Sequence, residues 1–334
     1  MTTTPAMTDK RSTEPRATRR WRRRLGRLLV AAALIGVLVF DRSPLAIVAV
    51  LFVLVVPFEK LFPRHPGQRV RRPDVGTDMA YAIGQPALAV AGIAVAVMVG
   101  IASLAWVPGL AIRPLVAMIP GGIKPFVGIA LFDLAIYWVH RWSHEVPVLW
   151  RFHSIHHSTE HLDWVSGFRS HPFDGAIVAP PFVFLLAAGF TAEFSGLLAV
   201  IQIVTGIFLH ANVRWRLRPL HRVVITPEFH HWHHANETSA INTNYSVFLP
   251  LWDLLFGSYH MPSDRRPQRY GVDEPIPDGI VAQLAHPLRG IGNPFRVVRH
   301  PVRSARGGWR FTRRLVRDIG RSTFRSRQAV VTRF

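Results

Sequence analysis

Long apolar runs are the feature that most limits how this chain can fold. The 334-residue sequence contains six of them, separated by segments that are polar or rich in Pro and Gly. A helix needs about 20 apolar residues to cross a bilayer, and within the bilayer only helices and closed barrels satisfy all their backbone polar groups. The runs therefore predict an all-α fold, an integral membrane helical bundle, and they cover residues 28–40, 45–62, 79–106, 123–139, 175–190 and 194–209.

The number of membrane spans depends on how the first two runs fold. Residues 28–40 and 45–62 are both near the lower length limit for a span. They form either a tight hairpin that crosses twice or one span with a neighbour that lies partly in the interface. We expect about six transmembrane helices, with five as the main alternative. Pro180 and Pro181 should kink the helix of the fifth run, and 107–122 should be a connection punctuated by Pro and Gly.

Basic residues gather near the two ends of the chain, whose net charge is +20. Residues 287–334 hold 13 Arg and one acidic residue, Asp318. With six spans, both termini and the histidine clusters lie on one side, and the positive-inside rule makes that side cytoplasmic. Nucleic acid is one conventional partner for such a charge. In a membrane chain, attraction to an anionic leaflet is the simpler explanation, so we expect no nucleic-acid partner.

These patterns divide the chain into four parts. Residues 1–27 form a basic, partly disordered N-terminal segment, and 28–74 form a transmembrane hairpin with a basic loop. We expect retained helices here rather than a cleaved signal peptide. Residues 75–285 form the main membrane domain with a cytoplasmic, histidine-rich helical cap. The Arg-rich tail, 286–334, has a weak apolar stripe, which fits either a membrane-surface helix or a solvated, disordered segment.

Histidine is concentrated in the cap, where 13 of the 17 histidines lie between His140 and His234. Three sets have helical spacing: one is i, i+4 and two are i, i+3, i+4, so each set projects from one face of a helix. Neutral imidazole is a ligand for Zn, Cu, Fe and Ni. Eight imidazoles exceed the needs of one tetrahedral zinc and suit two metal ions of higher coordination number. The eight candidate ligands are His140, His144, His153, His156, His157, His230, His233 and His234.

Some neighbouring residues are candidates for support rather than for ligation. Asp133 lies inside an apolar run, where an ionised carboxylate is costly. We expect it to accept the free N–H of a ligand imidazole, with a capped polar residue near the interface as the alternative. His161 follows His157 by four residues and could be a ligand or an outer hydrogen-bond donor. Thr226 and Pro227 are predicted to be the N-cap and first residue of the helix that carries the third set.

The histidine sets and their surroundings resemble a known family. HRWSH, HSIHH and HHWHH are similar to the HxxxH, HxxHH and HxxHH boxes of the fatty acid hydroxylase and sterol desaturase superfamily. The resemblance covers roughly residues 75–285. It includes the D-x3-Y-x2-HR lead-in at 133–141, RxHP at 169–172, FxHxN at 208–212 and TPxxHxxHH at 226–234.

The resemblance implies a membrane enzyme that contains two iron ions without haem and uses O2 to hydroxylate or desaturate a lipid. It makes His210 a possible ninth metal ligand. A further set of residues could contact the ligands from outside: Asp133, Tyr137, His161, His171, Asn212 and His231.

A membrane-embedded, zinc-dependent hydrolase is the alternative function. Zinc hydrolysis needs a general base near the metal-bound water, such as the Glu of HExxH. Arg141 stands at that position in the first set, and the other two sets contain no Glu, so we favour oxidation. The sequence has no haem, flavin or iron–sulfur motif and no cysteine. An external electron donor, such as a ferredoxin or cytochrome with its reductase, is therefore expected.

Overall fold

The computed structural model of this chain describes residues 43–190, 206–289 and 301–324. The basic segment 1–27, the first apolar run at 28–40 and most of the sixth at 194–209 lie outside the described residues. The described part is built from helices, with two isolated β-bridges, one from Pro63 to Val213 and one from Ala235 to Tyr270. The prediction of an all-α fold is confirmed for this part of the chain.

Three of the predicted runs form the longest apolar helices: α2 (Ser43–Leu61), α3 (Val75–Ala102) and α5 (Lys124–Glu145). Within the described ranges, α3 alone is long and apolar enough to cross a membrane. Its side chains are largely unburied, and Val90 is 70% and Ile93 63% exposed. A large exposed apolar surface of this kind fits contact with lipid. The complete bundle of about six spans stays a prediction.

The segment expected to be a connection punctuated by Pro and Gly, 107–122, is mainly helix α4 (Trp106–Ala117). Pro108 lies in the first turn of α4, where a missing N–H is tolerated. Helix α4 packs against α7 (Ala179–Ala187). A Cβ at Gly109 would lie 2.5 Å from the Phe184 carbonyl oxygen, so glycine permits this close approach.

The fifth apolar run is divided rather than continuous. Residues Asp174–Val178 form a short 3-10 helix, η2, which passes into α7 at Ala179. Pro180 and Pro181 occupy the first turn of α7, where proline fits without removing an intrahelical hydrogen bond. The prolines therefore mark a change of helix type, and the kink expected at this point stays a prediction.

A hairpin of two helices brings the first two histidine sets together. Helix α5 ends at Glu145, and Val146 adopts an extended conformation before Pro147 begins α6 (Pro147–His157). The third set lies on α9 (Pro227–His233), whose N-cap is Thr226. The Thr226 hydroxyl accepts a hydrogen bond from the Phe229 N–H at 3.3 Å, as the sequence predicts.

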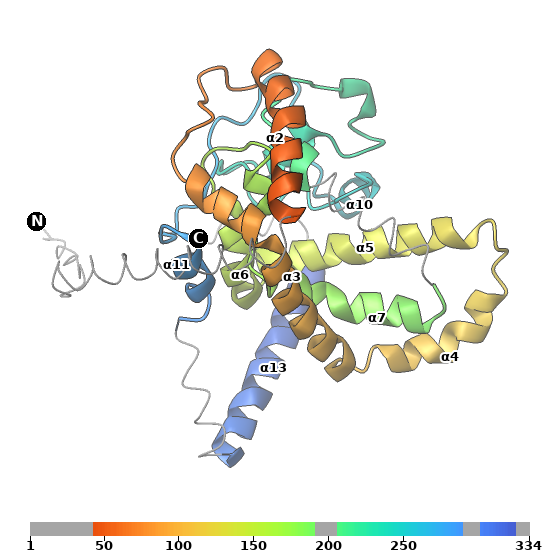
Figure 1. The fold of residues 1–334 in the computed structure, drawn as a ribbon. Helices are drawn as coiled ribbons and strands as arrows, with labels where there is room; N and C mark the ends of the chain where they lie inside the picture. Colours follow the sequence, from red (N-terminus) through yellow and green to blue (C-terminus); the bar gives the residue numbers. More distant parts are fainter. Residues whose placement is uncertain (1–42, 191–205, 290–300, 325–334) are drawn as a thin grey trace, which may run out of the picture.

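Several of the remaining elements lie around this centre, whereas the helix formed by part of the tail extends away from it (Figure 1). Residues 301–324 of the Arg-rich tail form a helix, α13, and contact of this helix with a membrane surface stays a prediction. The other described elements are η1 (Ser166–Phe168), η3 (Arg218–Leu220), α10 (Leu251–Phe256), α11 (Ile280–Ala285) and α13 (Pro301–Phe324).

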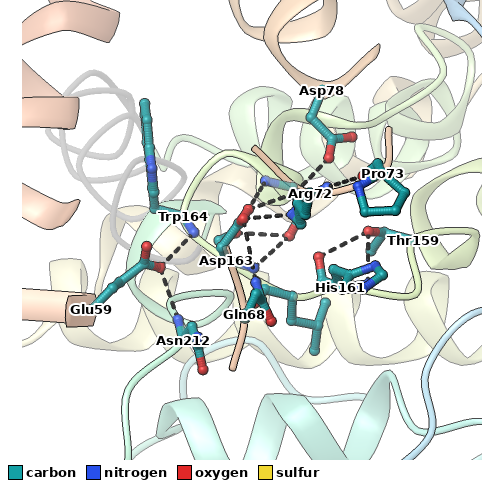
Figure 2. Close-up of polar contacts among 12 residues, drawn as sticks. Glu59, Gln68, Arg72, Pro73, Asp78, Thr159, His161, Asp163, Trp164 and Asn212 are labelled. Atoms are coloured by element: carbon teal, nitrogen blue, oxygen red, sulfur yellow. Dashed lines mark hydrogen bonds and ion pairs between the residues drawn. The ribbon is translucent and has the colours of Figure 1, made fainter. Parts of the chain in front are cut away.

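A buried network of ion pairs joins α3 to the loops beside α6 (Figure 2). The Arg72 guanidinium contacts both oxygens of Asp163 at 2.6 Å and Asp78 at 2.7 Å. Asp78 also accepts a hydrogen bond from Arg169 at 2.5 Å. All four side chains are buried, with Asp78 fully so. Buried charges are tolerated only when they are paired and hydrogen-bonded, so the network fixes how these segments meet.

Replacement of Arg72 should strongly destabilise the fold. Arg72→Met would leave Asp78 and Asp163 with one buried cation, Arg169, between them, and removal of one partner of a buried pair costs about 3–5 kcal/mol. We expect a clear fall in the thermal unfolding midpoint of the detergent-solubilised protein. Arg71→Met is the matched control, because Arg71 is the exposed neighbour. Equal midpoints for the two variants would contradict the role of the network.

Candidate metal centre

Five histidine side chains from three helices converge to form a first group. Their ligand nitrogens all lie within 4.8 Å of one another. The His144 ring is central, with centroids 4.5 Å from His157 and 4.6 Å from His233. The group consists of His140 and His144 from α5, His153 and His157 from α6, and His233 from α9.

Four more histidines form a second group beside the first. Their ligand nitrogens also lie within 4.8 Å of one another, and they are His156, His210, His230 and His234. Three of these face one another through their Nε2 atoms: His210 is 3.2 Å from His230 and from His234, and the last two are 3.0 Å apart. The His157 ring of the first group stacks on His234 at 4.1 Å, so the two groups adjoin.

The helical spacing explains how one short helix serves both groups. His153 and His157 are one turn apart and join the first group, whereas His156 is turned away and joins the second. In α9 the pattern is reversed: His230 and His234 join the second group and His233 the first. The sequence predicts two metal ions, but it does not show which histidines of each set would bind which ion. His210, predicted as a possible ninth ligand, lies in the second group.

Main-chain carbonyls orient several of the imidazoles. The Nδ1 atom of His140 lies 2.6 Å from the Tyr245 carbonyl oxygen, and that of His233 lies 3.0 Å from the Thr243 carbonyl. In the second group, His156 Nδ1 lies 2.9 Å from the Arg169 carbonyl. A carbonyl oxygen only accepts, so each Nδ1 carries the proton. The lone pair of each ring then lies on Nε2, on the opposite side, where it can bind a metal.

A carboxylate orients a fourth ring. His153 Nδ1 lies 2.8 Å from Asp174 Oδ2, at the start of η2. We expected Asp133 to accept the N–H of a ligand imidazole in this way, and that prediction is wrong. Asp133 instead accepts from the Phe248 and Leu249 main-chain N–H groups and from the Trp252 indole at 2.8 Å. It thereby fixes the segment that leads into α10.

Burial keeps these imidazoles neutral. Removal from water, together with the neighbouring His153, lowers the pKa of His156 to about 4. Burial likewise holds the pKa values of His157, His230 and His233 well below the usual range, with other histidines adding to the effect. Metal binding requires the unprotonated ring. At neutral pH these side chains are therefore in the form that binds metal.

The donor atoms fit a metal ion. Within the described chain, the buried Nε2 atoms of His144, His157 and His233 have no hydrogen-bond partner. An unsatisfied buried polar atom costs about 1–3 kcal/mol, so three close together need a ligand. Metal–imidazole bonds of about 2.0–2.1 Å place neighbouring ligand nitrogens about 3.0–3.4 Å apart. The Nε2 separations of 3.0 and 3.2 Å in the second group agree with this spacing.

A cavity of about 270 Å³ lies against both groups. Its histidine wall includes His140 and His153 of the first group and His156, His210 and His230 of the second. The other walls are largely apolar or formed by glycine, and they include Ile136, Val139, Gly175, Val178, Gly206, Leu209 and Val247. The cavity can therefore hold an apolar group beside both sets of nitrogens.

The three other histidines considered from the sequence lie outside both groups. His171 Nε2 lies 3.1 Å from the Leu284 carbonyl oxygen. The main-chain N–H and carbonyl of His161 both contact the Thr159 hydroxyl, so this residue belongs to the loop after α6. His231 is buried with its ring beside Tyr270.

The remaining residues of that predicted set, Tyr137 and Asn212, form hydrogen bonds with residues around the site. The Tyr137 hydroxyl lies 2.8 Å from Ser258 Oγ, and the Asn212 side chain accepts the His65 main-chain N–H. The sequence analysis missed Asp174, although it directly follows the RSHP segment and a Phe. It also missed Thr243 and Tyr245, which act through main-chain carbonyls that no side-chain pattern can reveal.

Comparison with known proteins gives consistent matches. Residues 125–258 match the sequence model of the fatty acid hydroxylase family. Ornithine lipid hydroxylase OlsE of Rhizobium tropici is 30% identical over 183 residues, which cover 54% of this chain and 55% of that protein. Alkylglycerol monooxygenase of Danio rerio is 30% identical over 161 residues, covering 45% of this chain and 32% of that protein. The chain thus spans about half the length of the first relative and a third of the second. No solved structure matches it significantly.

Each histidine group should bind its own metal ion. His144→Ala removes a ring at the centre of the first group, and His230→Ala removes one from the second. Each variant should lose roughly one of two bound ions, because the other group keeps its own ligands. Elemental analysis of the purified protein measures this directly. His286→Ala is the control, because His286 lies outside both groups. Full metal content in both of the group variants would refute the assignment.

Proposed function

Because this chain belongs to the fatty acid hydroxylase and sterol desaturase superfamily, we propose that it is a membrane-bound oxidoreductase that uses O2 to hydroxylate or desaturate a lipid. Relatives named as a lipid hydroxylase and as monooxygenases support this class of reaction. The observation that carries the proposal is the cavity, since it brings an apolar volume against both histidine groups.

Two iron ions are the cofactor we propose for the two groups. The first would be held by the five histidines centred on His144 and the second by the four that include His210. Imidazole suits several transition metals, and the family membership favours iron among them. Reduced iron with nitrogen ligands and open positions supplies the capacity to activate O2.

The protein's own residues hold the ligands and exclude water. Asp174 accepts the Nδ1 proton of His153, and the Tyr245 carbonyl accepts that of His140. These contacts keep each Nε2 lone pair aimed into its group. Most of the histidines are buried, which protects a reactive centre from solvent and from side reactions.

The substrate we propose is a lipid whose apolar chain enters the cavity. Ile136 and Val139 on α5 and Val178 on η2 form apolar walls of the cavity that the histidines also line. A C–H bond of a chain bound between them would lie beside both groups. The exposed apolar side chains of α3 and α4 support delivery of such a substrate from a bilayer.

The electrons for this reaction would come from an external ferredoxin- or cytochrome-type donor with its reductase. The site would lie at the cytoplasmic ends of the membrane helices, with both termini on the same side. The basic residues of the loop that follows α2, which include Arg64, Arg69 and Arg71, support this orientation.

The reaction should require O2, iron and reductant together. Iron-loaded protein, reductase and a membrane lipid extract would be incubated under oxygen-18-labelled O2, and the lipids analysed by mass spectrometry. Hydroxylation should place one labelled atom in the product, whereas desaturation should create a double bond without incorporating oxygen. A product formed without O2 or reductant would contradict the proposal and support the zinc hydrolase instead.

A variant that fills the cavity ties this activity to the proposed site. Gly206 lines the cavity, and a Cβ built there meets no described atom within 4 Å. Gly206→Leu should keep its metal but lose at least ten-fold in product, since the added side chain occupies the substrate volume. Gly76→Leu is the matched control, because Gly76 is also helical and unobstructed but lies outside the cavity.

A further inference from the structure

Helix α13 separates its charged and apolar residues around its axis. At about 100° per residue, the five arginines from Arg310 onward fall within an arc of about 100°. They are Arg310, Arg313, Arg314, Arg317 and Arg321. The apolar residues occupy the opposite side, and they are Trp309, Phe311, Leu315, Val316 and Ile319.

The apolar side of α13 is only partly covered by the rest of the protein. Trp309 is 64%, Phe311 52% and Val316 63% exposed, whereas Leu315 and Ile319 are partly buried. Figure 1 shows the helix extending away from the body of the molecule. Both its arginines and three large apolar side chains are therefore available to a partner.

One end of α13 is anchored close to the first histidine group. The Ser322 hydroxyl donates to Glu145 at 2.7 Å, and the Trp142 indole donates to the Thr323 hydroxyl at 3.1 Å. Glu145 is the last residue of α5 and follows the ligand candidate His144. The helix is thus attached to the end of α5 from which the first group is built.

We propose that α13 lies on an anionic membrane surface, with its apolar side in the lipid and its arginines against the headgroups. An interfacial helix has this combination of a basic polar face and large apolar residues on the other. Arginine-rich segments are attracted to anionic leaflets. An acidic protein or a nucleic acid would also attract the arginines, but attraction of charge alone leaves the exposed Trp309 and Val316 uncovered, whereas a lipid surface satisfies both sides of the helix. The attachment at Glu145 would then set the first histidine group at a fixed distance from the lipid surface.

Site-specific fluorescence tests this arrangement in the intact protein. The chain has no cysteine, so Val316→Cys and Arg317→Cys each give one labelling site. These neighbours point about 100° apart, one on the apolar side and one on the arginine face. The labelled, metal-loaded protein would be reconstituted in phosphatidylcholine nanodiscs with and without phosphatidylglycerol.

In the anionic discs, the emission of an environment-sensitive dye at position 316 should shift to the blue, and a quencher on the lipid chains should quench it several-fold more than the dye at 317.

Replacement of Arg310, Arg313 and Arg314 by Gln should abolish the dependence on phosphatidylglycerol, while Lys at the same positions should preserve it. Metal content should be unchanged in every variant. Equal quenching at 316 and 317, or equal behaviour in the two lipids, would overturn the proposal. Protection of 316 only by an added acidic protein or oligonucleotide would also overturn it.

Discussion

Nine imidazoles that converge in a buried space are the constraint on which the rest of this structure depends. Nitrogens that face one another at 3.0–3.2 Å gain little from hydrogen bonds among themselves, and protonation is disfavoured because the surroundings are buried. A shared metal ion resolves both problems, because it accepts several lone pairs at once. The arrangement of α5, α6 and α9 follows from this requirement: each must present its histidines toward the same volume.

The surroundings hold those helices in place through buried contacts from distant parts of the chain. The Arg169 guanidinium donates a hydrogen bond to Asp78 on α3, and the Arg169 carbonyl oxygen accepts one from His156. The ion network of Figure 2 therefore extends directly to the second histidine group. Gly167 permits equally close packing, because a Cβ there would lie 1.6 Å from the Gly206 carbonyl oxygen and 3.0 Å from a nitrogen of His210. The two histidine groups and their support form one packed unit.

Local patterns predicted much of this centre. The i, i+3, i+4 spacing of His153, His156 and His157 indicates a helix that presents several ligands, and Thr226 indicates where α9 begins. The division of each set between two groups depends on where α5 and residues 206–210 lie in space, and spacing along one helix does not contain that information. For the same reason Asp133 was assigned the wrong partner, since its contacts come from residues more than a hundred positions away.

The membrane architecture was harder to predict for a different reason. Apolar content does not distinguish a spanning helix from a shorter one, as α4 and the division between η2 and α7 show. Pro108 lies in the first turn of α4, where proline is tolerated, and Pro114 lies inside the helix, so the prolines of 107–122 did not prevent α4 from forming. Helix α3 has both the length and the apolar exposure that a span requires.

The central claim is that the nine histidines bind two separate iron ions. The most direct measurement is an anomalous difference map, collected at the iron absorption edge, from crystals of the iron-loaded protein. The account predicts two peaks, one within bonding distance of His144 and His233 and the other within bonding distance of His210 and His230. A single peak shared by all the ligands, or a peak outside both groups, would contradict it.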